Sequence, residues 1–284
     1  MRSRVTWIWH RTQSWRGIAL GIATAVLVLQ SVVPTFGAPT PQAQPTPVSP
    51  QPTPVSPQPT PVPRVPSFFD VDPVFRAYYD THDGFRLLGR AISRPHILTG
   101  RLVQYFEKGR MEDHRGESPD PAFQFQYGLL VDELIAVRSL APVGGDVSTV
   151  TYATIADEAI EAKRVPVPPG FTPGQPMTVV NGVFIPFSAA LSAAPGHVVH
   201  PLFWEYITRA DLFPGGWLHD IGLPITEPME AVVTKGPVSG RRIIVQAFQR
   251  TILTYDPLNP PDWQVERANV GTDYFRVFPD RVPQ

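Results

Sequence analysis

The stretch VQYFEK at residues 103–108 returns in altered form as VQAFQR at residues 245–250. Two further blocks recur in the same order, PVFRAY (73–78) as PLFWEY (201–206) and LGRAIS (88–93) as IGLPIT (221–226). Ordered matches that lie far apart in one chain indicate an internal duplication. We therefore predict two copies of one structural unit.

Each copy is expected to combine a short helix with strands. Asp72 is a suitable N-cap before Pro73, and the apolar residues that follow fall on one helical face, with Gly84 as the expected stop. The glycine block predicts a turn, and the valine-rich blocks predict strands. The repeated Phe and Tyr positions mark a buried core.

The region between the two copies has a different sequence pattern. Residues 154–164 have the spacing of one amphipathic helix, and Asn181-Gly182 between two apolar runs is a strong hairpin signal. We predict an α+β fold made of two related small helix-plus-antiparallel-strand units, at 67–134 and 200–284. A helix and hairpin region at 135–199 joins them.

The N-terminus has the pattern of an export signal. Residues 1–16 are basic, residues 17–29 are apolar or small, and cleavage after Gly37 would place small residues at the required positions. We predict a signal peptide at 1–37 and a secreted or cell-surface protein. The alternative is an uncleaved membrane anchor facing outward, although the apolar run is short against the ~20 residues of a typical span.

A proline-rich segment at residues 38–66 follows. It holds 12 prolines within 28 residues, and proline disfavours both helix and sheet while favouring an extended polyproline conformation. We predict a disordered Pro/Thr/Gln-rich linker. It is either a stalk that holds the folded part away from a surface or a passive leader.

Composition excludes several functions. Outside the first 37 residues the chain carries 20 basic and 25 acidic side chains, so nothing attracts nucleic acid, and a membrane is expected only through an uncleaved N-terminal segment. Cysteine is absent, which removes disulfides, thiol nucleophiles and thiolate metal sites. Glu112-Asp113-His114 could place ligands near a metal, but adjacent residues on a strand point to opposite faces, so we interpret it as an exposed turn. We predict no metal and no cofactor.

The most interesting cluster lies around the loop at residues 211–220. Trp217 and His219 are candidates for stacking on a ligand such as a sugar ring, with Trp204 as a further ligand-binding candidate. His219, Asp220 and Asp211 are the weak catalytic candidates. The alternative is that Trp204 and Trp217 belong to the core.

The motif running from Phe213-Pro214-Gly215-Gly216 to the VQAFQR block resembles a known pattern. It is similar to the Gly-Gly…Gly-x-Pro…Val-Gln-x-Phe-Glu-Arg pattern of uncharacterised secreted proteins of green non-sulfur bacteria, and more loosely to the LGFP repeats of bacterial cell-surface proteins. The resemblance covers residues 68–134 and 200–275. It implies an exported, wall-associated or ligand-binding role and supplies no catalytic residue.

Two functional hypotheses follow. The first is an exported, non-catalytic binding module on a proline-rich stalk, with cell-wall glycan or another surface protein as its partner. The second is an exported glycan hydrolase that uses carboxylates or the His219-Asp220 pair. Two acids that face each other in a cleft would favour the hydrolase. A shallow aromatic patch would favour the binding module.

The export signal gives the first testable prediction. Because a basic segment precedes a short apolar one, we expect the mature protein to begin near Ala38. N-terminal sequencing of protein recovered from the medium or the cell surface measures this directly. Recovery of an intact chain that starts at Met1 in the membrane fraction would instead identify the segment as an anchor.

Overall fold

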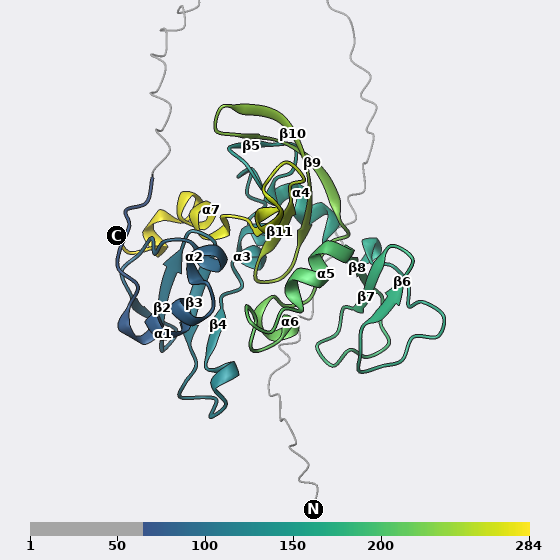
Figure 1. The fold of residues 1–284 in the computed structure, drawn as a ribbon, viewed down its shortest axis with the longest axis horizontal. Coiled ribbons are helices and arrows are strands. Elements are labelled where there is room, and N and C mark those ends of the chain that lie inside the picture. Colours follow the sequence, from purple (N-terminus) through teal and green to yellow (C-terminus); the bar gives the residue numbers. More distant parts are fainter. Residues whose placement is uncertain (1–64) are drawn as a thin grey trace, which may run out of the picture. The chain divides into compact units, whose positions relative to one another are not determined.

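The computed structural model describes residues 65–284, which form helices and three antiparallel sheets (Figure 1). This α+β architecture is the predicted fold class. The predicted signal peptide (1–37) and nearly all of the predicted linker (38–66) lie outside the described residues. Among the residues described, no helix is both long and apolar enough to cross a membrane.

Two groups of elements repeat one another. The first group comprises α1 (Pro73–Thr81), α2 (Gly84–Leu88), β1 (His96–Leu98), β2 (Arg101–Phe106), β3 (Gly109–Asp113), η1 (Pro121–Phe123), β4 (Phe125–Tyr127) and α3 (Leu130–Ala136). The second comprises α5 (Pro201–Ile207), α6 (Trp217–Asp220), β9 (Met229–Lys235), β10 (Val238–Ala247), β11 (Ile252–Tyr255), η3 (Pro261–Trp263), β12 (Val265–Arg267) and α7 (Val270–Val277). The order of helices and strands is the same in both.

The pairing of the strands repeats as well. In the first sheet, with strand order β1-β2-β3-β4, Val103 lies opposite Glu112. In the second sheet, which adds β5 at the edge beyond β9, Val245 lies opposite Thr254. These are corresponding positions of the matched sequence blocks, so we call the two groups of elements the first and second repeat.

One buried glutamine performs the same task in each repeat. The Gln104 amide oxygen accepts the backbone N–H of Asp72 at 2.9 Å, and its nitrogen donates to the carbonyls of Asp70 and Ser93. Gln246 accepts from the N–H of His200 and donates to the carbonyls of Val198 and Thr226. In both repeats this side chain therefore ties the start of the first helix and the glycine turn to the central strand.

The helix starts follow the prediction more closely than the helix ends. Asp72 caps α1 by accepting from the N–H of Val74, and Pro73 occupies the first turn. Gly84 does not stop this helix. The chain leaves α1 at Thr81, passes through Asp83 in the left-handed conformation, and begins α2 at Gly84.

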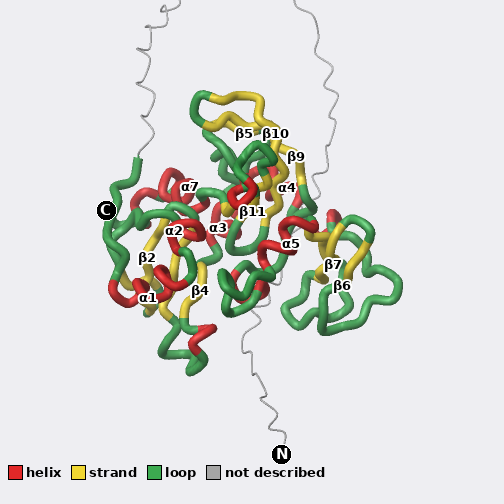
Figure 2. Tube along the Cα trace, in the orientation of Figure 1, coloured by secondary structure: helices red, strands yellow, loops and turns green. Residues whose placement is uncertain are grey.

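The connecting region contains β5 (Val147–Ser148), α4 (Tyr152–Glu158), η2 (Glu161–Lys163), β6 (Met177–Val179), β7 (Gly182–Pro186) and β8 (Gly196–Val199). The helix begins earlier than expected because Thr151 forms a capping box with Thr154, and it ends at Glu158. The predicted hairpin is present, with Val179 paired to Gly182, so that Val180 and Asn181 form its loop. Long loops flank this small sheet (Figure 2).

The two repeats pack on each other reciprocally. Helix α2 of the first contacts β12 of the second, α6 of the second contacts β4 of the first, and α3 contacts its counterpart α7. The guanidinium of Arg267 lies 4.3 Å from the ring centre of Tyr127, its equivalent in the other repeat. Equivalent elements of the two repeats therefore contact each other in both directions. This is the pattern of contacts across an approximate two-fold axis.

The packing at this junction is close. The amide of Thr272 in α7 donates to the carbonyl of Glu107 in the β2–β3 turn at 3.0 Å. A Cβ atom at Gly271 would lie 1.9 Å from the carbonyl oxygen of Phe106, so only glycine allows this approach. The second repeat is thus docked directly on the hairpin of the first.

The buried glutamines generate the second prediction. Replacing Gln104 or Gln246 by Leu leaves one backbone N–H and two carbonyls without their partners, so we expect each change to lower the free energy of unfolding by about 2–4 kcal/mol. Urea unfolding followed by tryptophan fluorescence measures this. Gln126→Leu, on half-buried β4, is the matched control and should change stability by less than about 1 kcal/mol. Equal effects at all three positions would contradict the assigned role.

Candidate ligand-binding groove

The two tryptophans singled out from the sequence lie together. Trp204 on α5 and Trp217 at the start of α6 have ring centres 5.7 Å apart. Both are half-buried and pack against the hydrophobic core that includes Phe203 and Leu212. Both rings therefore contribute to the core, which is the alternative interpretation given for them in the sequence analysis.

His219 and Asp220 also lie together, at a contact between the repeats. His219 Nδ1 is 2.7 Å from Asp220 Oδ1, and the buried Asp220 also accepts the N–H of Gly215 at 3.0 Å. The imidazole meets the ring of Phe123 edge-on, with centres 4.9 Å apart. In the other half of the junction Arg86 lies over Trp263 in the equivalent way. The pair therefore has a packing role between the repeats.

Asp211 is apart from this pair. Its side chain is exposed and forms an ion pair with Arg209 at 2.6 Å, which lowers the pKa of the carboxyl. Its charge is thus already compensated by a neighbour two residues away.

A different part of the first repeat forms a groove of about 990 Å³. We call it the main groove. Its walls are the outward face of β1–β4, helix α3, Tyr274 of α7, the C-terminal segment, and Arg250 from the second repeat. The lining side chains used below are His96, Tyr105, Arg110, Glu112, His114, Asp132, Glu133, Arg250, Tyr274 and Arg281.

The floor of the main groove carries charged side chains at positions that are uncharged in the second repeat. Tyr105 on β2 lies opposite Arg110 on β3, and Glu112 shares their face because alternate strand residues point the same way. The equivalent positions of the second repeat are Ala247, Ile252 and Thr254, of which the first two belong to a hydrophobic core. The fold is therefore compatible with uncharged residues at these positions, and the first repeat carries Arg110 and Glu112 instead.

Arg110 is the centre of the network on this floor. Its guanidinium donates to Glu112 Oε1 at 2.7 and 2.9 Å, to Tyr105 Oη at 3.1 Å and to Glu133 Oε1 at 3.3 Å. The side chain is only 7% exposed. Bonds to three partners fix Arg110 and hold both carboxylates in place. The groove thus has a rigid, charged floor.

His114 extends this network towards the rim. Its Nε2 lies 3.4 Å from Glu112 Oε2 and its Nδ1 lies 3.2 Å from Glu117 Oε2. Burial opposes the charge of Glu112, but the hydrogen bonds from His114 and Arg110 outweigh it and lower the pKa to about 2. The interpretation of residues 112–114 as an exposed turn was wrong, because Glu112 and Asp113 end strand β3 and His114, directly after it, is buried next to Glu112.

Asp132 and Arg250 are the uncommitted charges of the main groove. Within residues 65–284 Asp132 has no hydrogen-bonding or ion-pair partner, and burial raises its pKa to about 6 despite the nearby Arg250. Arg250 enters from the second repeat, donates to the carbonyl of Tyr127, and forms no ion pair with the described residues. An acceptor and a donor with free bonding capacity therefore face the same space from different repeats.

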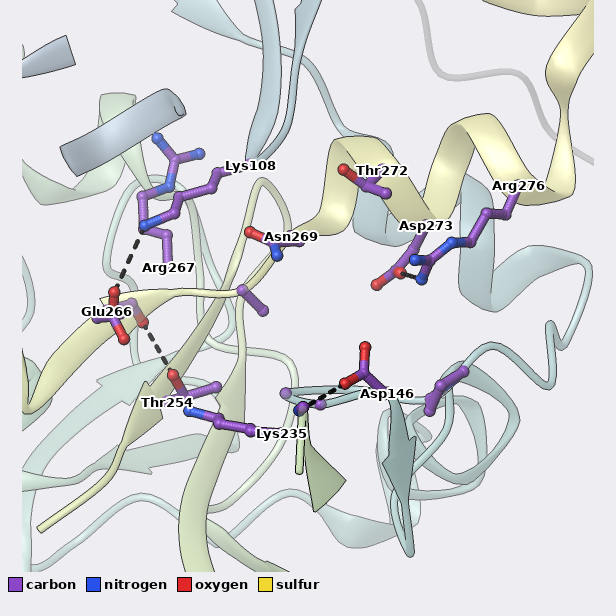
Figure 3. Close-up of a pocket in the computed structure, with 15 residues that line it drawn as sticks. Lys108, Asp146, Lys235, Thr254, Glu266, Arg267, Asn269, Thr272, Asp273 and Arg276 are labelled. Carbon is purple, nitrogen blue, oxygen red and sulfur yellow. Dashed lines mark hydrogen bonds and ion pairs between the residues drawn. The ribbon is translucent and has the colours of Figure 1, made fainter. Parts of the chain in front are cut away.

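A smaller cavity of about 310 Å³ occupies the equivalent place over the second repeat (Figure 3). We call it the minor cavity. Lys108 from the first repeat enters it, as Arg250 enters the main groove. Further equivalent pairs line the two sites: Asp132 and Thr272, Glu133 and Asp273, Leu129 and Asn269, Gln126 and Glu266. The approximate two-fold axis thus relates the two sites.

No group of three or more His, Asp or Glu residues within the described part of the chain is arranged to hold a metal ion. The ligand sets of both sites are instead mixtures of acids, bases, hydroxyls and amides. Groups of this kind can hydrogen-bond a polar organic ligand.

Comparison with known proteins adds no assignment, since no family model, curated protein or solved structure matches this chain. The resemblance to secreted and LGFP-repeat proteins therefore stays a prediction.

The residues of the main groove were missed in the sequence, although a signal was present. Setting the two copies side by side places Arg110, Glu112 and His114 opposite Ile252, Thr254 and Asp256. Arg110 and Glu112 are charged where the second copy has the uncharged Ile252 and Thr254, and this difference indicates that the face has another function in the first copy. Asp132 carried no such signal, because a single acid in the first turn of a helix is ordinary.

The raised pKa of Asp132 generates the third prediction. The folded protein holds this proton more tightly than the unfolded chain, so the ionised carboxylate opposes folding above about pH 6, and the penalty disappears below pH 3.8. We expect Asp132→Asn to raise the free energy of unfolding by about 1 kcal/mol at pH 7.5, a value reduced for partial exposure, and to leave it unchanged at pH 3.5.

Urea unfolding at both pH values checks this expectation. Asp157→Asn is the control, because Asp157 is exposed and only pairs with Arg138 on the surface. A loss of stability at pH 7.5 in Asp132→Asn would show that the carboxylate has a stabilising partner, contrary to the geometry.

Proposed function

We propose that the protein is an exported, non-catalytic, cell-surface or wall-associated binding module whose ligand occupies the main groove. The observation that carries this proposal is the charged face of the first repeat, where Arg110 and Glu112 stand at positions that the uncharged Ile252 and Thr254 hold in the second repeat. Burying charge in a network costs stability relative to well-packed apolar residues. A ligand that uses these groups accounts for their presence.

Wall glycan is the ligand class that suits this groove best. Carboxylates, guanidinium groups and an imidazole can donate to and accept from many hydroxyls at once. His96, Tyr105 and Tyr274 form a stacked aromatic series along one side, with ring centres 5.8 and 5.5 Å apart. The export pattern of residues 1–37 and the proline-rich segment are consistent with presentation at a surface.

Residues 211–220, a loop that ends in helix α6, do not form the ligand site in this proposal. Trp204, Trp217 and the His219-Asp220 pair contribute to the core and to the repeat junction. The ligand-binding role predicted for them is accordingly transferred to Asp132, Arg250 and their neighbours.

A second candidate function is glycan hydrolysis in the same groove. It is favoured by one observation: Glu112 and Asp132 line one groove with pKa values of about 2 and about 6. One carboxyl with a raised pKa and one with a lowered pKa in the same groove is the division of roles that glycosidases use. The His219-Asp220 pair lies outside the residues that line this groove.

Retention on isolated cell wall tests the binding proposal and gives the fourth prediction. Asp132→Ala and Arg250→Met should each weaken binding by about 10-fold or more, because each removes a hydrogen bond to a charged group. Arg242→Gln is the control, since Arg242 is exposed and pairs only with Glu230 on the surface. It should bind within about twofold of the parent.

The same samples separate the two candidate functions. Under the binding proposal no soluble sugar is released from the wall over hours of incubation. Under the hydrolase alternative the parent releases sugar, while Asp132→Asn stays bound and releases none, since it lacks the proton donor. A parent protein that neither binds nor cleaves would contradict both.

A further inference from the structure

We propose that the minor cavity is a second site for the same class of ligand, so that the protein binds glycan at two points. This inference rests on the proposed function of the main groove. It is carried by the approximate two-fold axis and by the side chains that line the minor cavity.

The exchange of basic residues is the first argument. Lys108 lies in the β2–β3 turn of the first repeat and reaches the minor cavity, where Glu266 Oε1 is 3.7 Å from its ammonium. Arg250 lies in the corresponding turn of the second repeat and reaches the main groove. Each site is therefore completed by a cation from the opposite repeat, and neither repeat would contain the whole site.

The lining of the minor cavity is the second argument. Asn269 and Thr272 bring an amide and a hydroxyl to the positions that Leu129 and Asp132 hold in the main groove. Figure 3 shows the Asp273 carboxylate, paired with Arg276, and the Asp146 carboxylate on opposite sides of the space. Hydroxyl, amide, carboxylate and guanidinium groups around one cavity suit the hydroxyls of a sugar.

The difference in size predicts a difference in what each site accepts. Residues 142–146 pass over the second repeat, and Gly144 and Gly145 pack closely on β9 and β10. This segment narrows the minor cavity to about 310 Å³, against about 990 Å³ for the main groove. The minor cavity is accordingly expected to take a shorter stretch of glycan.

Two sites on one body change how the protein holds a polymer. Once one site has bound a glycan strand, the second binds at a high effective concentration, provided that both can be engaged together. Retention on insoluble wall should therefore be much tighter than binding of a short soluble fragment. Loss of either site should bring wall retention down towards the single-site value.

Binding stoichiometry tests the inference. Titration calorimetry of the purified protein with short glycan fragments released from isolated wall should give two fragments per chain. Lys108→Met and Arg250→Met should each bind one fragment per chain. The double variant should show no measurable binding. Asn269→Phe should also bind one fragment per chain. This change lies at an exposed position of the minor cavity and avoids the repeat junction.

The outcomes separate this inference from the proposed function. One fragment per parent chain, or two fragments per chain in both Lys108→Met and Asn269→Phe, would overturn the second site while leaving the main groove as the binding site. Absence of any binding by the parent would instead refute the proposed function. Arg242→Gln should keep two sites, and circular dichroism checks that every variant is folded.

Discussion

The hydrogen bonds of one buried glutamine hold each repeat together. Gln104 and Gln246 sit at the middle of their sheets, and each connects the entry of a helix, the glycine turn and the central strand through three bonds. Each bonded group would otherwise be an unpaired buried amide or carbonyl, which is costly. These bonds therefore fix the start of α1 or α5 and the glycine turn on the central strand of each repeat.

The repeats depend on each other as much as on their own glutamines. The hairpin turn of each repeat sends a basic side chain, Lys108 or Arg250, towards the other, and Arg267 stacks on Tyr127 near the approximate axis. Gly271 permits α7 to touch the β2 carbonyls directly. The site-forming residues therefore come from both copies. A duplication can thus create grooves that a single unit lacks, since each groove forms only where the copies meet.

The sequence predicted the parts of the fold that follow from repeated local patterns. The N-cap at Asp72, the strands around Val103 and Val245, and the hairpin before Gly182 could be predicted because cap chemistry, β-branched runs and turn residues act over a few positions. The groove could not be assembled from the sequence, because Asp132, Glu112 and Arg250 meet only after the repeats dock. Trp217 and His219 drew attention by residue type, and their burial became clear only from the packing of α6 on β4.

The outward faces of the two sheets differ between the repeats, and this difference indicates how the two copies have diverged. In the second repeat, β10 and β11 present Val245, Ala247 and Ile252 to a core that the connecting region covers. In the first, Val103, Tyr105 and Arg110 stand at the matching positions and line the main groove. An apolar face needs a cover to stay out of water, whereas a face built on Arg110 and its three partners can remain open. The open groove of the first repeat can therefore carry a group such as Asp132, whose burial opposes folding.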